Sequence, residues 1–502
     1  MTALLLVSVG PKLVAGLALP ALGALWAGNG RATPAWRRAA ALAGAAAAAA
    51  LLARLLLVAP THRVFYDEYE HLDLARNLAE RGVYAATMGF VPGALTVDRL
   101  PLWPPLAHLH YAALFLVRGY SEGAVYALNV ALSCLVPLAA AAASFTAFAN
   151  PAAAGLTALF LALSPVAVSY ASTADLSSVA LLWTALAWLA VLRAEKRDGR
   201  RDLWAAGLTV AAALHARPDG LLLLPPLLWL LARRGRAAAG PAAMALASGL
   251  PLLVLAWSAR AAGHDGYGDS WGSLSGRAPL QALENLWFFL EPSSPRPLLL
   301  AAAAWGFWSL RRERVARALA LSAGLYFALY AAYPTSAFGR GSGDKYALAV
   351  ELPLALLAGL GAARLLEKRP RALLAGVAAA GVLAPLSLRP HSDPGYAASD
   401  AFLRRLAPHL AGAPPLLTFV PPAGRAVLDA AVVHPRLLLE KGPAALDPAG
   451  RGFLLLRDEA GERRPADAAA LDALVKALYA ERELYAEEAA GRRRALTRLT
   501  PR

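Results

Sequence analysis

The stretch FYDEYEHLDLARNLAERGVYAATMGFVPGALTVDRLPLWPP, residues 65–105, decides how the rest of the chain is interpreted. It is the most polar stretch of the N-terminal half, and long apolar runs precede and follow it. Polar residues between membrane-spanning runs are expected to face water or a cavity. The stretch is therefore a candidate site, and its acidic and histidine side chains are Asp67, Glu68, Glu70, His71 and Asp73.

A structural interpretation of the same residues is also open. Asp67 followed three residues later by Glu70 is typical of a helix N-terminus, where the first side chain caps the helix and the second returns the bond. Apolar residues at helical spacing follow, and Gly82 predicts the end of that helix. A capping carboxylate at a membrane surface can also accept a proton, so the two interpretations do not exclude each other.

The composition predicts a polytopic membrane protein. Of the 502 residues, 58% are hydrophobic and 17% are charged, whereas a soluble domain is usually about half apolar and a quarter charged. The net charge of +15 lies largely in arginine clusters between apolar runs. This arrangement indicates orientation in a membrane and argues against a nucleic-acid partner. The single cysteine, Cys134, allows no intramolecular disulfide.

About 12 apolar runs approach the length of roughly 20 residues that crosses a bilayer. The first contains Lys12 and lacks a basic start, which argues against a cleaved signal peptide. The expected spans are 3–27, 37–59, 123–148, 151–169, 174–192, 203–215, 219–232, 238–257, 297–310, 318–333, 345–365 and 371–388.

Five basic clusters are expected to orient these spans, because positively charged loops stay in the cytoplasm. The alternation works only if the stretch 101–118, with Pro104 and Pro105, lies at the outer face as a helix that does not cross. The polar loop after the second span and the tail from residue 389 then lie outside. The clusters occupy 31–38, 193–201, 233–236, 311–317 and 364–371.

The tail changes character and predicts a small α/β domain. It has strand-like runs at 416–420 and 453–456, followed by an expected amphipathic helix at 466–488. The predicted fold is thus an all-α polytopic membrane protein of about 12 transmembrane helices with a small α/β extracytoplasmic C-terminal domain. Its expected parts are an extra span and basic loop (1–36), a transmembrane catalytic domain (37–388, with the outer catalytic loop at 60–122) and the tail domain (389–502).

Several stretches, taken in order, resemble one family. DEYEHLDLARNLAERGVY (67–84) and DRLPLWPPLAHLHYAALF (98–115) are similar to the first extracytoplasmic loop of GT-C glycosyltransferases. The resemblance is closest to the protein O-mannosyltransferases and the aminoarabinose transferases of lipid A. SPVAVSYASTADLSSVALLW (164–183), LHARPDGLLLLPPLLWLL (214–231) and DKYALAVELPLALLAGLG (344–361) resemble later spans, with Lys345–Tyr346 where the family has Arg-Tyr. The resemblance covers about 37–388.

The resemblance implies a glycosyltransferase of the cell (inner or plasma) membrane. It implies a polyprenyl-phosphate monosaccharide as donor and an acceptor lipid, glycan or protein on the outer face. Asp67 is the expected general base and Glu68 the second acid of the pair. Arg99, Arg217 and Lys345 are the expected phosphate-binding cations. No cofactor is firmly implied, but a divalent metal could be held by Asp67 and Glu68.

The remaining substrate-site candidates are His71, His108, His110, Asp175, His215, Tyr267 and Tyr346. Asp175 also fits a helix cap, and Lys345 also fits a side chain that reaches to an interface. His108 and His110 are two residues apart, so they are expected on different sides of a helix. The alternative class is a lipid or glycolipid transporter or flippase without transfer chemistry. The polar residues gather at outer span ends rather than at mid-membrane, which favours the enzyme.

Overall fold

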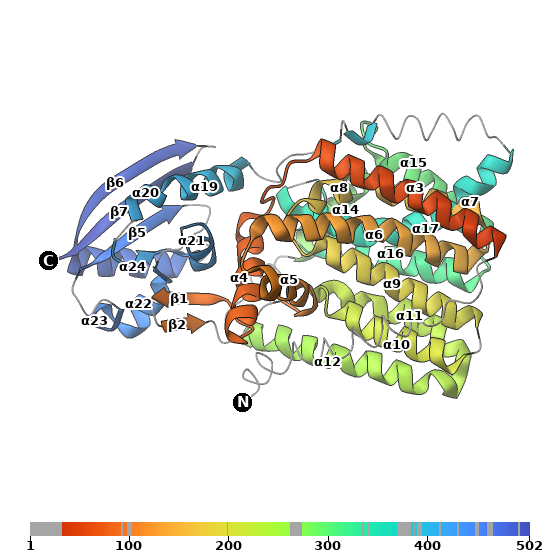
Figure 1. The fold of residues 1–502 in the computed structure, drawn as a ribbon, viewed down its shortest axis with the longest axis horizontal. Coiled ribbons are helices and arrows are strands. Elements are labelled where there is room, and N and C mark those ends of the chain that lie inside the picture. The colour runs from red at the N-terminus through yellow and green to blue at the C-terminus, as the bar shows by residue number, and fades with distance from the viewer. Residues whose placement is uncertain are drawn as a thin grey trace.

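A long helical bundle and a smaller α/β domain lie end to end, with helix α4 (Phe65–Arg81) between them (Figure 1). In this computed structural model the described residues are 33–91, 94–97, 103–197, 199–261, 274–333, 336–339, 341–368, 383–385, 387–388, 394–410, 413–428, 431–446, 451–458, 465–489 and 492–502.

Among the described residues, the bundle contains five helices that are long and apolar enough to cross a membrane, or six if one bent pair forms a single span. The bent pair, α7 and α8, turns by 58° at its break, within the predicted span 151–169. The bundle helices are α3 (Pro34–Leu57), α6 (Glu122–Phe148), α7 (Pro151–Ala162), α8 (Pro165–Ala171), α9 (Ser177–Lys196), α10 (Arg200–Leu214), α11 (Leu224–Leu231), α12 (Ala239–Ala261), α15 (Arg296–Leu310), α16 (Arg314–Ala332) and α17 (Ala347–Lys368).

The predicted number of about 12 spans is not confirmed. The predicted spans 203–215 and 219–232 correspond to α10 and to a 3-10 turn, η1 (Pro218–Leu223), that leads into α11. Neither α10 nor α11 reaches spanning length. The predicted span 3–27 and most of 371–388 lie outside the described residues.

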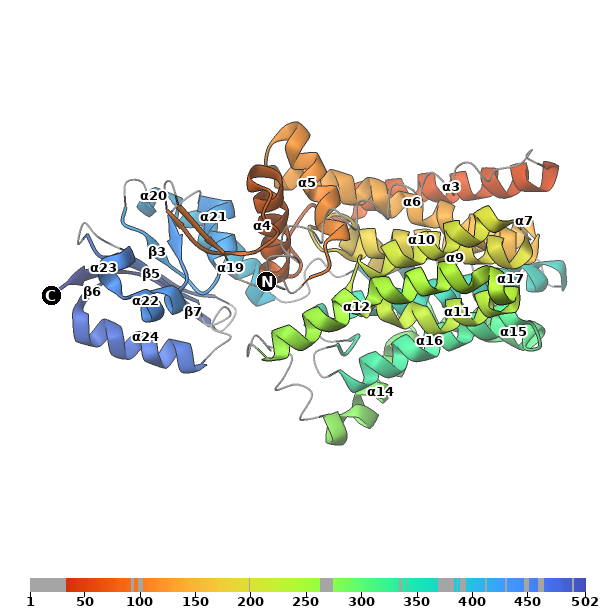
Figure 2. The same ribbon diagram turned by 90° about the horizontal axis from the view of Figure 1, so that it is seen from below.

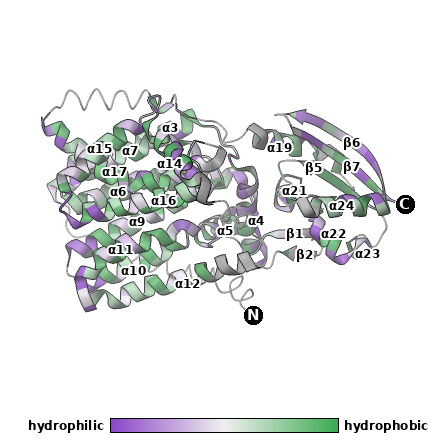
Figure 3. Ribbon diagram, turned by 180° about the vertical axis from the view of Figure 1, so that it is seen from behind, coloured by the Kyte–Doolittle hydropathy of each residue, from purple (hydrophilic) through white to green (hydrophobic). Residues whose placement is uncertain are grey.

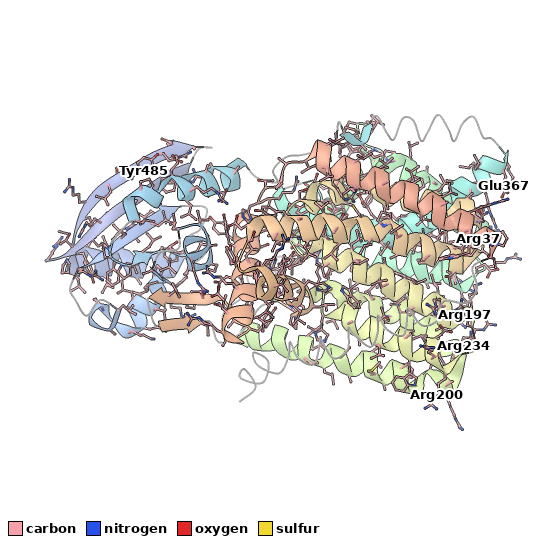
Figure 4. The ribbon with its side chains drawn as sticks, in the orientation of Figure 1. Arg37, Arg197, Arg200, Arg234, Glu367 and Tyr485 are labelled. Carbon is pink, nitrogen blue, oxygen red and sulfur yellow. The ribbon has the colours of Figure 1, made fainter. Side chains whose placement is uncertain are left out.

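The basic clusters gather at one end of the bundle, as the alternation of spans predicted. Arg37, Arg197, Arg200 and Arg234 lie together at the end remote from the α/β domain (Figure 4). Arg314 donates to the carbonyl of Trp229 at 2.5 Å, which places the fourth cluster beside the third. The hydrophilic helix α4 lies at the opposite end (Figure 3).

Close packing fixes α17 in the bundle. A side chain at Gly359 would meet Thr157 on α7, and side chains at Gly306 and Gly361 would meet the backbones of Leu357 and Ala302 across α15 and α17. Small residues at such crossings let helix backbones approach each other. These contacts fix the second half of α17 against α7 and α15.

The α/β domain has a mixed sheet of seven strands in the order β2-β1-β4-β3-β5-β7-β6, with short helices on both sides (Figure 2). Two of its strands, β1 (Thr87–Val91) and β2 (Ala94–Val97), come from the loop after α4, so the sheet joins that loop to the tail. The other elements are α19 (Pro394–Arg405), α20 (Ala407–Leu410), β3 (Leu416–Leu417), α21 (Pro421–Leu428), β4 (Val432–Val433), α22 (Pro435–Lys441), α23 (Pro443–Leu446), β5 (Phe453–Asp458), α24 (Pro465–Leu478), β6 (Tyr479–Ala489) and β7 (Arg492–Pro501).

The expected tail helix 466–488 is wrong in its second half. The helix α24 ends at Leu478, and the following residues form β6. Antiparallel pairing of β6 with β7, from Tyr479↔Pro501 to Ala489↔Arg492, overrides the helical periodicity of that stretch. Both strand-like runs are present as β3 and β5, although β3 is shorter than expected.

Helix α4 begins three residues earlier than the capping interpretation requires. Its N-cap position is Val64, with no side-chain cap, so Asp67 lies within the first turn and does not cap the helix. It ends at Gly82 as predicted, where φ is 68° and the backbone N–H returns to Leu78. The helix α5 (Leu106–Arg118) packs against α4 and is too short to span, as expected for 101–118.

Candidate active site

Three consecutive residues of the 3-10 turn η3 (Gly341–Tyr346) reach three different parts of the molecule. Asp344 accepts hydrogen bonds from Arg63 Nη2 at 3.2 Å and from Tyr170 Oη at 2.7 Å. Lys345 points into a cluster of carboxylates, and Tyr346 stacks under a second cation. The turn that opens α17 thus organises the site.

Lys345 joins Asp67 and Asp175. Its Nζ lies 3.1 Å from Asp67 Oδ2 and 3.0 Å from Asp175 Oδ2. Asp67 comes from α4, and Asp175 comes from the turn between α8 and α9. The side chain of Asp67 is 18% exposed, whereas those of Lys345 and Asp175 are 5% and 4% exposed. Asp67 is therefore the carboxylate of this cluster that a substrate can reach.

Asp175 is held in its ionised form. Its Oδ1 accepts the backbone N–H of Ser177 at 2.8 Å and the hydroxyl of the same residue. Burial alone would raise the pKa of the Asp175 carboxyl, but the positive charges of Lys345 and Arg217 outweigh burial and lower it below the ordinary value. The N-cap position of α9 is Leu176, without a side-chain cap, so Asp175 lies one residue before it and binds the first N–H of the helix as well as Lys345.

Arg217 belongs to a second charged group next to the first. Its Nε lies 3.2 Å from Asp219 Oδ1, and its guanidinium lies 5.0 Å from the ring centre of Tyr346. Tyr330 donates its hydroxyl proton to Asp219 and lies 4.8 Å from Tyr346, centre to centre. The turn at residues 215–220 thus brings Arg217 beside the Lys345–Tyr346 pair.

A pocket opens from this second group into the bundle. Arg217 and Asp219 line it together with side chains from α9, α10, α16 and α17. Most of the remaining wall is apolar, as with Ala180, Leu181 and Leu348. Among described residues, it is thus a pocket with a charged end and an apolar body.

His71 lies one turn after Asp67 and connects to a buried chain of polar groups. Its Nδ1 lies 3.1 Å from Nε2 of His108, whose Nδ1 lies 2.8 Å from the Tyr84 hydroxyl. Tyr84 donates its proton to the carbonyl of Trp103 at 2.8 Å. His108 Nδ1 must then carry a proton, Nε2 must accept, and His71 donates from Nδ1. This assignment leaves Nε2 of His71 as a hydrogen-bond acceptor.

Burial keeps both histidines neutral. It lowers the pKa of His71 to about 4, against the opposing pull of the Asp175 and Asp67 carboxylates. Burial and the neighbouring His71 also lower the pKa of His108 well below its ordinary value. His71 therefore faces the charged cluster as a neutral imidazole, and His108 supports it from behind.

Glu68 does not join Asp67 in the site. Its Oε1 accepts the backbone N–H groups of Arg63 at 2.7 Å and Val64 at 2.8 Å. Its Oε2 accepts the N–H of Ala174 at 2.8 Å and lies 3.0 Å from His62 Nδ1. All four lone-pair positions are used, so Glu68 has none left for a substrate or a shared metal ion. The expected acidic pair is corrected to one site carboxylate and one structural carboxylate.

Other predicted residues fall outside the cluster. His110 donates to the carbonyl of Leu106 at 2.8 Å and lies against Trp183, on a different side of α5 from His108, as its spacing predicted. His215 ends α10, and its carbonyl accepts the N–H of Leu106 at 3.0 Å. Arg99 and Tyr267 lie outside the described residues.

Asp219, Tyr330 and Asp344 were not among the predicted site residues. Asp219 sits in the same polar turn as Arg217, and Asp344 directly precedes Lys345, so their positions gave a signal that could have been used. Tyr330 lies at the end of an apolar helix, and nothing in its sequence neighbourhood marks it. Among the described residues no three His, Cys, Asp or Glu side chains are grouped to hold a metal ion.

Known sequences give no guide, because neither a family model nor a curated protein matches the chain. Solved structures do match. ArnT from Cupriavidus metallidurans bound to undecaprenyl phosphate superposes with a TM-score of 0.58 at 15% identity, covering 90% of this chain and 97% of that one.

The oligosaccharyltransferase of Archaeoglobus fulgidus is also similar. Its complex with zinc and sulfate gives a TM-score of 0.55 at 14% identity, covering 86% of this chain and 69% of that one. The form tethered to an acceptor peptide gives 0.54 at 13% identity, with coverage of 89% and 72%. At these identities the likeness concerns the fold. The chain therefore has the fold of GT-C membrane glycosyltransferases, as the order of its sequence stretches predicted.

Proposed function

We propose that the protein is a membrane glycosyltransferase that moves a monosaccharide from a polyprenyl-phosphate donor to an acceptor hydroxyl, with Asp67 as general base. The observation that carries the proposal is the cluster of Asp67, Lys345 and Asp175 beside the pocket of Arg217. A base and phosphate-binding cations are the two functions that such a transfer requires of the protein. The fold shared with an enzyme solved with undecaprenyl phosphate supports the lipid-linked donor.

The reaction is a single displacement. The acceptor oxygen attacks the anomeric carbon and its proton passes to Asp67. The bond from that carbon to the phosphate oxygen breaks, and polyprenyl phosphate leaves with the bonding electron pair. Asp175 is buried and bonded to Lys345 and Ser177, so it is not placed to form a covalent sugar intermediate. One displacement step inverts the anomeric configuration.

The donor phosphate needs more positive charge than the described cluster supplies. The cluster has three carboxylates and two cations, so its net charge is −1. The carboxylates are those of Asp67, Asp175 and Asp219, and the cations are Lys345 and Arg217. Arg99, four residues before Trp103, is the residue proposed to supply the third cation. Charge-assisted hydrogen bonds from these cations to phosphate are about twice as strong as neutral ones.

The cavity beside Arg217 and Asp219 has a volume of about 20 Å³, enough for a water-sized group, and we propose that it marks where the donor phosphate meets the bundle. It starts at Arg217 and Asp219 and continues between apolar helices that the hydropathy assigns to the membrane. The phosphate is proposed to lie at the charged end, with the isoprenoid chain along the apolar helices outside the cavity. His71, with an acceptor nitrogen, is available to orient a hydroxyl of the sugar or of the acceptor.

The test uses purified protein in lipid nanodiscs and a panel of undecaprenyl-phosphate monosaccharides with a radiolabelled hexose or pentose. We expect label to leave the lipid by transfer or slow hydrolysis, with inverted configuration in the product. Movement of intact donor across proteoliposomes without loss of label from the lipid would reject the transferase and favour the flippase. A product with retained configuration would reject the single displacement.

A further inference from the structure

Helix α4 presents two opposite faces to two different partners. Asp67 and His71, four residues apart, face the charged cluster. The residues that face the C-terminal domain recur at spacings of four, four and three, which keeps them on one side of a helix. Two residues of helix rotate by about 200°, so this docking face lies opposite Asp67. It consists of Tyr69, Asp73, Asn77 and Glu80.

Arg425 of α21 is the main contact on the docking face. It is fully buried, and its Nη1 donates to Asp73 Oδ1 at 2.9 Å and to Asn77 Oδ1 at 2.6 Å. Its Nη1 also donates to Thr87 Oγ1 at 3.1 Å, and its Nη2 lies 3.2 Å from Glu80 Oε2. Asp73, Asn77 and Glu80 belong to α4 and Thr87 to β1, so all four partners come from the outer loop and none from the C-terminal tail that carries Arg425.

A second polar contact lies one turn nearer the N-terminus of α4. Tyr69 donates its hydroxyl proton to Asp400 Oδ1 at 2.6 Å and accepts from Arg404 Nη2 at 3.0 Å. Arg404 also lies 3.1 Å from Glu122 at the start of α6. The helix α19 therefore connects α4 to the first helix after the outer loop.

Backbone pairing joins the same two parts. In the sheet, β1 pairs antiparallel with β4, with Gly89 opposite Val433. His434 continues the pairing by donating its N–H to the carbonyl of Met88 at 2.7 Å. A side chain at Gly89 would come within 3.0 Å of Leu437, so glycine permits this approach. The C-terminal domain thus contacts both α4, through side chains, and β1, through backbone pairing.

We propose that the C-terminal domain is a positioning element of the active site, with Arg425 as its principal positioning residue. Arg425 holds α4 by its docking face. Because the helix is rigid, this contact also fixes the position of Asp67 on the opposite face. The domain then acts on the transfer step through α4, without contacting donor or acceptor. This inference rests on the proposed function for its catalytic part, whereas the docking of α4 is independent of it.

The catalytic test compares full-length variants in nanodiscs, with kcat expressed per site titrated by undecaprenyl phosphate, so that unfolded molecules do not count. We expect Arg425→Gln to lower kcat at least tenfold while KM for the reactive donor changes less than about threefold. Arg425→Lys should recover part of the loss, because it keeps the charge beside Asp73. Arg436→Gln is the control, because its ion pair with Glu440 lies on the surface of the same domain.

Hydrogen exchange tests the docking without any substrate. Arg425→Gln should speed exchange of the α4 amides about tenfold or more and leave α9 and α17 unchanged. If Arg425→Gln does not fold, Tyr69→Phe decides, with an expected several-fold loss of kcat. Wild-type kcat per site in Tyr69→Phe and in every folded Arg425 variant would overturn the proposal. If the wild-type protein uses none of the donors, the transferase proposal is rejected. If the α4 amides then still exchange faster in Arg425→Gln than in the wild type, the docking role of Arg425 is supported independently.

Discussion

Asp344, Lys345 and Tyr346 are adjacent in the chain, yet each holds a different part of the site. Asp344 binds Arg63 just before α4, Lys345 binds Asp67 and Asp175, and Tyr346 stacks on Arg217. In a tight 3-10 turn successive side chains point in different directions, which lets three neighbours reach three partners. The proposed general base, the cation next to it and the proposed phosphate-binding arginine are therefore fixed by one turn.

Replacing Arg217 with alanine is expected to weaken binding of undecaprenyl phosphate about 10- to 100-fold. A hydrogen bond to a charged group contributes about 1.5–3 kcal/mol, which corresponds to that range. Titration of the purified variant with undecaprenyl phosphate measures the effect, and Arg436→Ala in the C-terminal domain serves as a matched control. Equal affinity in Arg217→Ala and the control would remove Arg217 from the phosphate site.

Much of the site could be predicted, because its members occupy the outer ends of apolar runs. Lys345 is 278 residues from Asp67 and 170 from Asp175, but the alternation of spans predicts all three residues at the same end of the bundle, and the structure brings them into contact. Glu68 could not be separated from Asp67 in the sequence. Glu68 is one residue further along α4, so its carboxylate points in a different direction and binds the backbone N–H groups of residues 63, 64 and 174. Only the fold shows that difference.

At the scale of elements, the start of α4 is fixed by buried charges. His62 lies between Glu68 at 3.0 Å and Glu122 at 3.4 Å, and its side chain is 2% exposed. Burial disfavours the imidazolium, but the hydrogen bonds and charges of Glu122 and Glu68 outweigh burial and raise the pKa of His62 to about 9. Protonated His62 thus holds α4 to the start of α6.

This arrangement predicts that the stability falls as the pH rises from about 6.5 to about 9. The folded protein keeps a proton on His62 that the unfolded chain loses near its ordinary pKa of 6.5, so the stabilisation is complete below 6.5 and is lost through about 9. The shift corresponds to about 3 kcal/mol at most. Thermal unfolding in detergent across this pH range measures it.

The control for that prediction is His62→Gln, which keeps a hydrogen-bonding side chain but cannot titrate. Its Tm should lie below that of the wild type at pH 6 and should change less between pH 6.5 and 9. Parallel Tm curves for the two proteins would show that another group causes the pH dependence.

Elements were predictable where local signals decide them. Gly82 ends α4 because a left-handed residue is needed there, and the sequence shows that directly. The second half of the expected helix 466–488 is a strand because β7 pairs with it, a partner that lies beyond the stretch itself. The hairpin of β1 and β2 was also missed, since β1 is completed by β4, more than 300 residues later in the chain.

At the scale of the whole molecule, the bundle separates a basic end from the α/β domain (Figure 4). We predict that the basic end faces the cytoplasm and the α/β domain lies outside. In a Cys134→Ser background, Glu440→Cys should react with an impermeant thiol reagent in intact cells, and Lys196→Cys should react only after lysis. The reverse pattern would place the site on the cytoplasmic side and contradict the proposed donor geometry.

Asp67 is proposed as the base for sugar transfer, and Asp67→Asn removes its ability to accept a proton while keeping its size. The side chain does not cap α4, so its replacement by an amide of the same size should leave folding and undecaprenyl phosphate binding near the wild-type level. An amide accepts no proton at neutral pH, so transfer should slow by about two to four orders of magnitude. Glu68→Gln is the control and should lose stability more than kcat per titrated site.

The decisive measurement is the rate of label transfer from the reactive undecaprenyl-phosphate sugar by wild type and Asp67→Asn, per donor-binding site. We expect a loss of about 100- to 10,000-fold with unchanged donor binding. An Asp67→Asn protein that transfers sugar at the wild-type rate would contradict the account, and a Glu68→Gln protein without activity would move the base to the neighbouring residue.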